Sequence, residues 1–184
     1  MTLGALRRRR SSLAWLLLIV ALGVLLAVLA AIPVLRSATD GRTGTLVGSP
    51  APALEAVDLD GQRWSLATTD ARVVWVNFWA TSCEPCRTEM PAMQRLAEAH
   101  EGELLVLGVD WGEGRDAVID FVDRYGVTYP ILLDPTLENY YRWASADGLP
   151  RHYFIGDDGV VLREVIGPLD PGQMVAIVGE LLES

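Results

Sequence analysis

Lysine is absent from this sequence of 184 residues, and cysteine is nearly so. All 15 basic side chains other than histidine are therefore arginines, and they face 24 acidic side chains. Five of the arginines precede residue 37 and no acid does, which leaves ten arginines against 24 acids, a net charge of −14, in the rest of the chain. A domain this acidic is not expected to bind nucleic acid through a basic patch.

The only two cysteines, Cys83 and Cys86, stand three positions apart. A disulfide across so short a loop removes little entropy from the unfolded chain, so its stabilising effect is small. The pair is therefore predicted to serve chemistry, as a redox-active disulfide with no other cofactor. A zinc site would need two further ligands, and only His100 and His152 offer imidazole, so no metal is expected.

Residues 13–35 form an uncharged apolar run of 23 residues. As a helix the run would span roughly 34 Å, enough to cross a hydrocarbon core of about 30 Å. The arginines Arg7–Arg10 precede it, which places residues 1–12 in the cytoplasm and the rest of the chain outside. We therefore predict a single-pass anchor in the cell membrane with an extracytoplasmic catalytic domain. The alternative is a secretory signal, whose apolar core is usually shorter, about 7–15 residues.

Beyond this run, residues 36–45 are predicted to be a linker and residues 46–184 a single α/β domain. Alternating strands and helices favour a sheet with parallel members, and the last strands add an antiparallel pair. The predicted elements are a hairpin of 54–59 and 63–66, strands 73–79, 104–109 and 129–133, helices 84–100, 115–125 and 136–144, a hairpin of 152–155 and 160–165, and a helix at 171–182. The buried stripe of the last helix is predicted to be Met174, Val175, Ile177, Val178, Leu181 and Leu182.

The segment WATSCEPCRTEMP, residues 79–91, follows a buried strand and opens a helix. Cys83 is thereby placed just ahead of the helix and Cys86 in its first turn. Unpaired backbone N–H groups at a helix start stabilise an anion, so the Cys83 thiolate should form below the usual pH of about 8.5. Cys86 is then placed to attack a mixed disulfide formed by Cys83.

These residues resemble the TlpA/ResA-like branch of the thioredoxin superfamily, which is related to the AhpC/TSA redoxins. Three segments within residues 46–184 carry the resemblance: NFWATSCEPCRTEMP, the tripeptide Gly148-Leu149-Pro150 followed by HYFI, and VGSPAPALEAVDLDGQRWSL. The resemblance implies a thioredoxin fold, with a central mixed β-sheet flanked by helices, an N-terminal β-hairpin extension and one preceding transmembrane helix.

The resemblance also implies roles for single residues. Glu89 would assist proton transfer, chiefly at Cys86. Pro150 would be a cis-proline beside the dithiol, and Leu149 would offer backbone groups to a substrate. Trp79 is predicted from its strand to be a core residue that shields the dithiol, and it is also a candidate for substrate binding. Asn77 stands where thioredoxin carries a buried aspartate.

The sequence departs from the branch at two places. Ser82 precedes the first cysteine where tryptophan is usual, and Arg151 with His152 follows the proline where small hydroxyl residues are commoner. His152 is predicted to be an ordinary strand residue.

The partners implied by the resemblance are protein disulfides such as that of apocytochrome c, and a membrane electron donor of the CcdA/DsbD type. The expected activity is that of a thiol–disulfide oxidoreductase acting as a protein-disulfide reductase, with cytochrome c maturation as the process served.

Two other functions remain open from the sequence. A Cu(I) metallochaperone of the same fold would use both cysteines and His152, although such proteins usually space their cysteines one residue further apart. A peroxiredoxin-like peroxidase would need a threonine and a proline where Ala80 and Val76 stand. A glycine pattern at 112–114 imitates a dinucleotide fingerprint, but too little chain remains for a second mononucleotide half, and we reject it.

Overall fold

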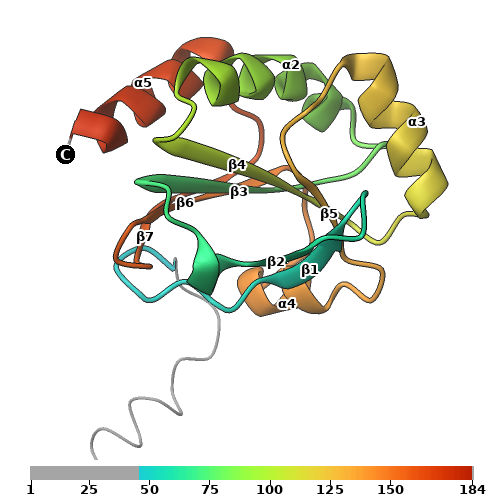
Figure 1. Cartoon of the computed structure of the whole chain (residues 1–184), viewed down its shortest axis with the longest axis horizontal. Coiled ribbons are helices and arrows are strands. Elements are labelled where there is room, and N and C mark those ends of the chain that lie inside the picture. The colour runs from blue at the N-terminus through green and yellow to red at the C-terminus, as the bar shows by residue number, and fades with distance from the viewer. Residues whose placement is uncertain (1–45, 184) are drawn as a thin grey trace, which may run out of the picture. The chain divides into compact units, whose positions relative to one another are not determined.

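The computed structural model describes residues 46–183, which form one seven-stranded sheet with helices on both faces (Figure 1). The strand order across the sheet is β2-β1-β5-β4-β3-β6-β7. The elements are β1 (Glu55–Asp58), β2 (Arg63–Ser65), η1 (Leu66–Thr68), β3 (Val73–Trp79), α2 (Glu84–Ala99), β4 (Leu104–Asp110), α3 (Arg115–Tyr125), β5 (Ile131–Leu133), α4 (Glu138–Trp143), β6 (Arg151–Gly156), β7 (Val161–Ile166) and α5 (Pro171–Glu183).

The sheet is mixed. Strand β4 runs parallel to β3 and to β5, whereas β6 is antiparallel to β3, β7 to β6, and β1 to both β2 and β5. The hairpin of β1 and β2 extends one edge. This is the predicted α/β architecture, a central mixed sheet flanked by helices with an N-terminal β-hairpin extension.

Strand β3 is buried along its whole length because it lies inside the sheet with helices over both faces. Its alternate side chains point to opposite faces. Trp75 and Trp79 belong to the core beneath α2, α3 and α5, and Phe78 belongs to the core on the side of α4 (Figure 1). The segment after β3, which leads to Cys83, is therefore attached to a strand that is buried at every residue.

Three details differ from the sequence prediction. Strand β5 begins at Ile131, because Pro130 has no N–H to donate to a ladder. Helix α4 begins only at Glu138, after Leu137 adopts a left-handed φ of 58°. Val175 was predicted to be buried, which is wrong: it is 59% exposed, because it lies off the stripe formed by Met174, Val178 and Leu181.

Within residues 46–183, no helix is both long enough and apolar enough to span a bilayer. The predicted anchor at 13–35 and the linker at 36–45 lie outside the described residues, so both stay predictions.

Candidate active site

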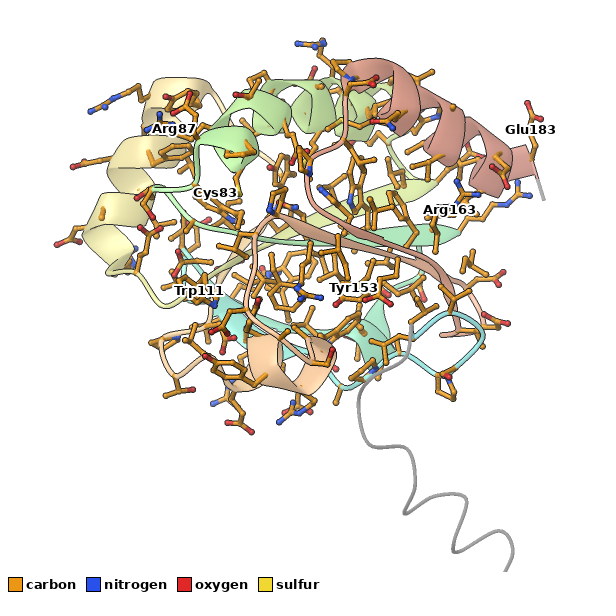
Figure 2. The ribbon with its side chains drawn as sticks, turned by 180° about the vertical axis from the view of Figure 1, so that it is seen from behind. Cys83, Arg87, Trp111, Tyr153, Arg163 and Glu183 are labelled. Atoms are coloured by element: carbon orange, nitrogen blue, oxygen red, sulfur yellow. A yellow bond between two sulfur atoms is a disulfide. The ribbon has the colours of Figure 1, made fainter. Side chains whose placement is uncertain are left out.

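The two cysteines lie where β3 gives way to α2. Cys83 is the N-cap of α2, Cys86 lies in the first turn, and their sulfurs are joined in a disulfide. Figure 2 labels Cys83 at the start of this helix. Cys83 is half-buried, whereas Cys86 is only 1% exposed. The outer sulfur is therefore the one that a partner can reach.

Backbone polarity favours negative charge on the Cys83 sulfur. The Cys86 N–H donates to Cys83 Sγ at 3.3 Å. Pro85 stands at the helix start, where its missing N–H leaves no hydrogen bond unmade. The partial positive charge of a helix N-terminus acts in the same direction. This arrangement suits a cysteine that reacts as a thiolate.

Pro150 lies beside the carboxyl end of β3. The pairing of Phe78 with Arg151 places the start of β6 there, next to the loop that carries the dithiol. The Leu149–Pro150 peptide bond is cis, as the resemblance implies. Leu149 is half-buried, and its backbone N–H and C=O make no hydrogen bond to other residues in the range 46–183. These groups are therefore free to pair with an extended segment of another chain.

The loop before Pro150 is fixed by side chains from two elements. Arg151, only 3% exposed, donates through Nε to the Gly148 carbonyl at 3.1 Å and through Nη2 to the Ala146 carbonyl at 2.6 Å. The Tyr140 hydroxyl, from α4, lies 3.1 Å from each of the same two carbonyl oxygens and has one proton to share between them. The unusual arginine after the proline thus holds the loop that presents Leu149.

Glu89 is buried behind the dithiol. It follows Cys86 by three positions on α2, so the two side chains project from the same side of the helix. Glu89 is 4% exposed, and its Oε1 accepts a hydrogen bond from the Leu169 N–H. Burial, followed by the charge of Glu89, raises the pKa of Tyr129. The position of Glu89 is compatible with the predicted role in proton transfer at Cys86.

His152 lies on a strand, as predicted, but the sequence did not predict its neighbours. It is 0% exposed on β6, and its Nε2 lies 3.5 Å from Glu89 Oε2. Its Nδ1 lies 3.3 Å from Trp75 Nε1 and 3.1 Å from Asn77 Nδ2. The signal available in the sequence was its place two residues after Pro150, where the branch usually has a small hydroxyl residue.

Trp79 is part of the core. It is 0% exposed, and its ring packs on Phe121 with a centroid distance of 5.0 Å. Its ring therefore presents no surface to a partner, and the predicted role in substrate binding stays a prediction.

Two acidic residues that the sequence analysis did not single out, the buried Asp110 and the half-buried Glu113, anchor the other side of the dithiol loop. Glu113 accepts from the Thr81 N–H at 2.5 Å and from the Thr81 hydroxyl at 2.6 Å. The Glu113 N–H in turn donates to Asp110 Oδ2 at 2.7 Å. Asp110 is 0% exposed, and burial raises its pKa to about 7. Thr81, two residues before Cys83, is thereby tied to the end of β4.

The rejected dinucleotide pattern has a structural explanation. Glu113, inside the glycine pattern, accepts from the N–H and hydroxyl of Thr81. Asp134, the acid that stands 20 residues after Gly114, accepts from the N–H groups of Asn139 and Tyr140 at the start of α4. Both acids therefore hold the fold together.

The geometry also weighs against the copper alternative. His152 Nε2 faces Glu89, and its Nδ1 is occupied by Trp75 and Asn77, so neither nitrogen is free for a metal held by the two sulfurs. In the part of the chain that the structure describes, no group of three or more His, Cys, Asp and Glu side chains is arranged to hold a metal ion.

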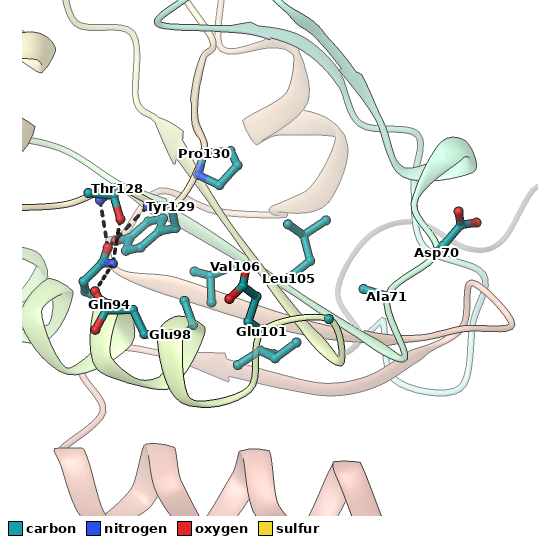
Figure 3. Close-up of a pocket in the computed structure, with 13 residues that line it drawn as sticks. Asp70, Ala71, Gln94, Glu98, Glu101, Leu105, Val106, Thr128, Tyr129 and Pro130 are labelled. Atoms are coloured by element: carbon teal, nitrogen blue, oxygen red, sulfur yellow. Dashed lines mark hydrogen bonds between the residues drawn. The ribbon is translucent and has the colours of Figure 1, made fainter.

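Several clefts in residues 46–183 lie away from the dithiol. One of about 610 Å³ lies between the C-terminal half of α2, β4 and residues 128–130 (Figure 3). Gln94 crosses it, accepting from the Thr128 N–H and donating to the Thr128 hydroxyl, both at 2.8 Å. None of its lining residues is Cys83, Cys86 or a neighbour of Pro150.

Comparisons with known proteins agree with this geometry. The sequence profile of the AhpC/TSA family matches residues 47–163. The thiol-disulfide oxidoreductase ResA of Geobacillus kaustophilus is 32% identical over 155 residues, which cover 83% of this chain and 88% of that protein. The thioredoxin-like protein YneN of Bacillus subtilis is 32% identical over 138 residues, covering 71% of this chain and 78% of the relative.

A solved structure shows the same fold. The thiol:disulfide interchange protein of the thioredoxin family from Chlorobium tepidum superposes with a TM-score of 0.64 at 28% identity, over 72% of this chain and 95% of that one. The mixed sheet is thus thioredoxin-like. The matched range 47–163 contains the dithiol, Glu89, Pro150 and His152, and the chain belongs to the AhpC/TSA family as a thiol-disulfide oxidoreductase of the ResA type.

Proposed function

We propose that this protein is a membrane-anchored reductase of protein disulfides, working outside the cytoplasmic membrane with Cys83 as nucleophile and Cys86 as resolving thiol. The observation that carries the proposal is the difference between the two sulfurs. One is half-buried and accepts the N–H of Cys86, whereas the other is buried one helical turn away.

In the first step the Cys83 thiolate attacks one sulfur of the partner's disulfide. The partner's S–S bond breaks, its second sulfur leaves as a thiolate that takes a proton from water, and a mixed disulfide forms. Cys86 then gives its proton to Glu89 and attacks Cys83 Sγ, which releases the partner's first sulfur. Two electrons have passed to the partner, and the Cys83–Cys86 disulfide remains. A dithiol donor in the membrane must reduce that disulfide by the same steps in reverse.

The partner would dock as an extended segment. The Leu149 N–H and C=O, which make no hydrogen bond within residues 46–183, can add one strand-like pairing, and the pairing of Phe78 with Arg151 at the end of β3 supports a docking site next to the dithiol loop. The net charge of −14 beyond residue 36 favours a partner with basic residues around its cysteines. A protein such as apocytochrome c, whose disulfide must be opened before haem is attached, fits this chemistry.

The location and the direction of electron flow rest on the sequence. The apolar run 13–35, preceded by Arg7–Arg10, supports an anchor with the domain outside. The resemblance to the TlpA/ResA-like branch supports reduction as the direction and cytochrome c maturation as the process.

The test uses the full chain in detergent, with a disulfide-bonded basic peptide as substrate. Cys83→Ser should abolish reduction, and Cys86→Ser should stop at a mixed disulfide that survives until a thiol is added. Val175→Ala, on the exposed side of α5, is the matched control and should keep full activity. The chain has no third cysteine that could substitute for either thiol, so full activity in both cysteine variants would overturn the proposal.

A further inference from the structure

A buried imidazole and a buried carboxylate face each other behind the dithiol. His152 is 0% exposed and Glu89 is 4% exposed. His152 Nε2 and Glu89 Oε2 are 3.5 Å apart, and neither atom has a hydrogen-bond partner among the residues that the structure describes. Two buried polar atoms that each lack any other partner are costly unless they serve one another.

The tautomer of His152 follows from its neighbours. Trp75 Nε1 lies 3.3 Å from His152 Nδ1, and an indole N–H can only donate. Asn77 Nδ2, which also approaches the Arg151 carbonyl at 3.4 Å, lies 3.1 Å from the same Nδ1. His152 Nδ1 must therefore be an acceptor without a proton. A neutral imidazole then carries its proton on Nε2, the nitrogen that faces Glu89.

The same contacts keep the ring neutral. A second proton would have to sit on Nδ1, where it would oppose the N–H of Trp75 and end that hydrogen bond. Both Trp75 and Asn77 are buried in β3, directly beside β6, so they cannot move away to make room.

We propose that His152 is a positioning residue for Glu89: a neutral imidazole, fixed as the Nε2–H tautomer, that keeps the buried carboxylate ionised and oriented to receive the proton of Cys86. The inference rests on the proposed exchange at Cys83 and Cys86. The Leu169 N–H donates to Oε1 of Glu89, and His152 Nε2 faces Oε2 from 3.5 Å.

Few other groups that can carry charge adjoin this pair. Cys86 lies on α2 itself, and the Tyr129 hydroxyl, ahead of β5, is close enough to feel the charge of Glu89. Arg151, next to His152 in sequence, is on the opposite face of β6 and is engaged with the Ala146 and Gly148 carbonyls. Without the His152 donor, no N–H of residues 46–183 faces Glu89 Oε2, and the carboxylate is held only by the Leu169 N–H at Oε1.

The first test reads the tautomer directly. The full chain has two histidines, so nitrogen NMR of the imidazoles in wild type and in His100→Gln assigns the His152 signals. We expect a proton on Nε2 and none on Nδ1 at neutral pH, because Nδ1 accepts from Trp75. A proton on Nδ1 would overturn the inference even if the protein reduces disulfides well.

The second test follows the resolving step. In His152→Leu the donor is lost, and we expect the mixed disulfide to resolve about tenfold more slowly near neutral pH, with the pH of half-maximal rate raised by about one unit. His152→Gln restores an N–H toward Glu89 and should recover most of the rate. In a Glu89→Gln background, His152→Leu should change the rate no further. His100→Gln, at the opposite end of α2, is the matched control.

The outcomes separate the two proposals. A wild-type chain that reduces no disulfide contradicts the proposed function, and the NMR result still decides the tautomer. A chain that reduces disulfides, with equal pH profiles in wild type and His152→Leu, keeps the function and overturns the role of His152. If His152→Leu does not fold, His152→Gln and the NMR measurement still carry the test.

Discussion

Among single residues, Asp110 is the one for which protonation and folding are most clearly linked. Its carboxyl is fully buried at the end of β4, and burial is the largest cause that raises its pKa from 3.8 to about 7. The Glu113 N–H lowers the pKa, whereas the charges of Glu113 and Asp134 raise it. The folded protein therefore holds this proton more tightly than the unfolded chain does.

The sign of the resulting pH dependence follows. Because the folded pKa is raised, the contribution to stability is fully present below about pH 4 and is lost as the pH rises through about 7. The loss at about pH 8 is at most about 4 kcal/mol. Asp110→Asn should remove this fall, so urea unfolding should show wild type losing stability relative to the variant between about pH 5 and about pH 8. A constant difference over that range would contradict the assignment.

The sequence predicts the site residues that lie in local motifs, but not which distant side chains meet. Cys83, Cys86, Glu89 and Pro150 lie within local motifs, and their positions on α2 and before β6 were predicted. His152 and Glu89 are 63 positions apart, and their meeting depends on the register between β3 and β6 and on the packing of α2 across the sheet. No local pattern carries that information.

At the scale of elements, the loop that presents Leu149 is held by two side chains, Arg151 at the start of β6 and Tyr140 of α4. Arg151 donates to the Gly148 and Ala146 carbonyls, and the Tyr140 hydroxyl reaches the same pair. Arg151→Ala leaves the tyrosine alone to hold the loop. We expect a loss of about 2 kcal/mol in unfolding free energy and a higher KM for a peptide disulfide, because the docking groups are less well ordered.

Arg151→Lys is the informative companion variant, because an ammonium keeps the charge but cannot span both carbonyls as the planar guanidinium does. Calorimetric melting and steady-state kinetics on the three chains provide the measurement. Equal melting temperatures for wild type and Arg151→Ala would show that Tyr140 alone fixes the loop.

The order and type of the elements followed from periodicity and turn residues. The bounds of α2, α3 and β3 were close to those observed because strong signals flank them, including Pro85 at the start of α2 and Gly126 after α3. The errors lie where one residue overrides the pattern. Strand β5 is shorter than predicted because of Pro130, and helix α4 begins later than predicted because of the left-handed Leu137. Val175 faces solvent because only one narrow stripe of α5 packs on the sheet.

At the scale of the whole molecule, the charge distribution and the apolar run 13–35 predict that the dithiol faces the outside of the cell. A maleimide that cannot cross membranes should therefore label Cys83 in intact cells after mild reduction, in a Cys86→Ser chain. Labelling that requires broken cells would contradict the predicted orientation. Cys83→Ser/Cys86→Ser gives the background, since the chain has no other thiol.

The central claim is that the start of α2 holds the Cys83 sulfur ready as a thiolate. The most direct measurement is the ultraviolet absorbance of the thiolate as a function of pH in the reduced full chain with Cys86→Ser. The absorbance of the Cys83→Ser/Cys86→Ser chain is subtracted as background. We predict that half of the change occurs below about pH 8.5, the value for a free cysteine. A midpoint at or above about 8.5 would contradict the account.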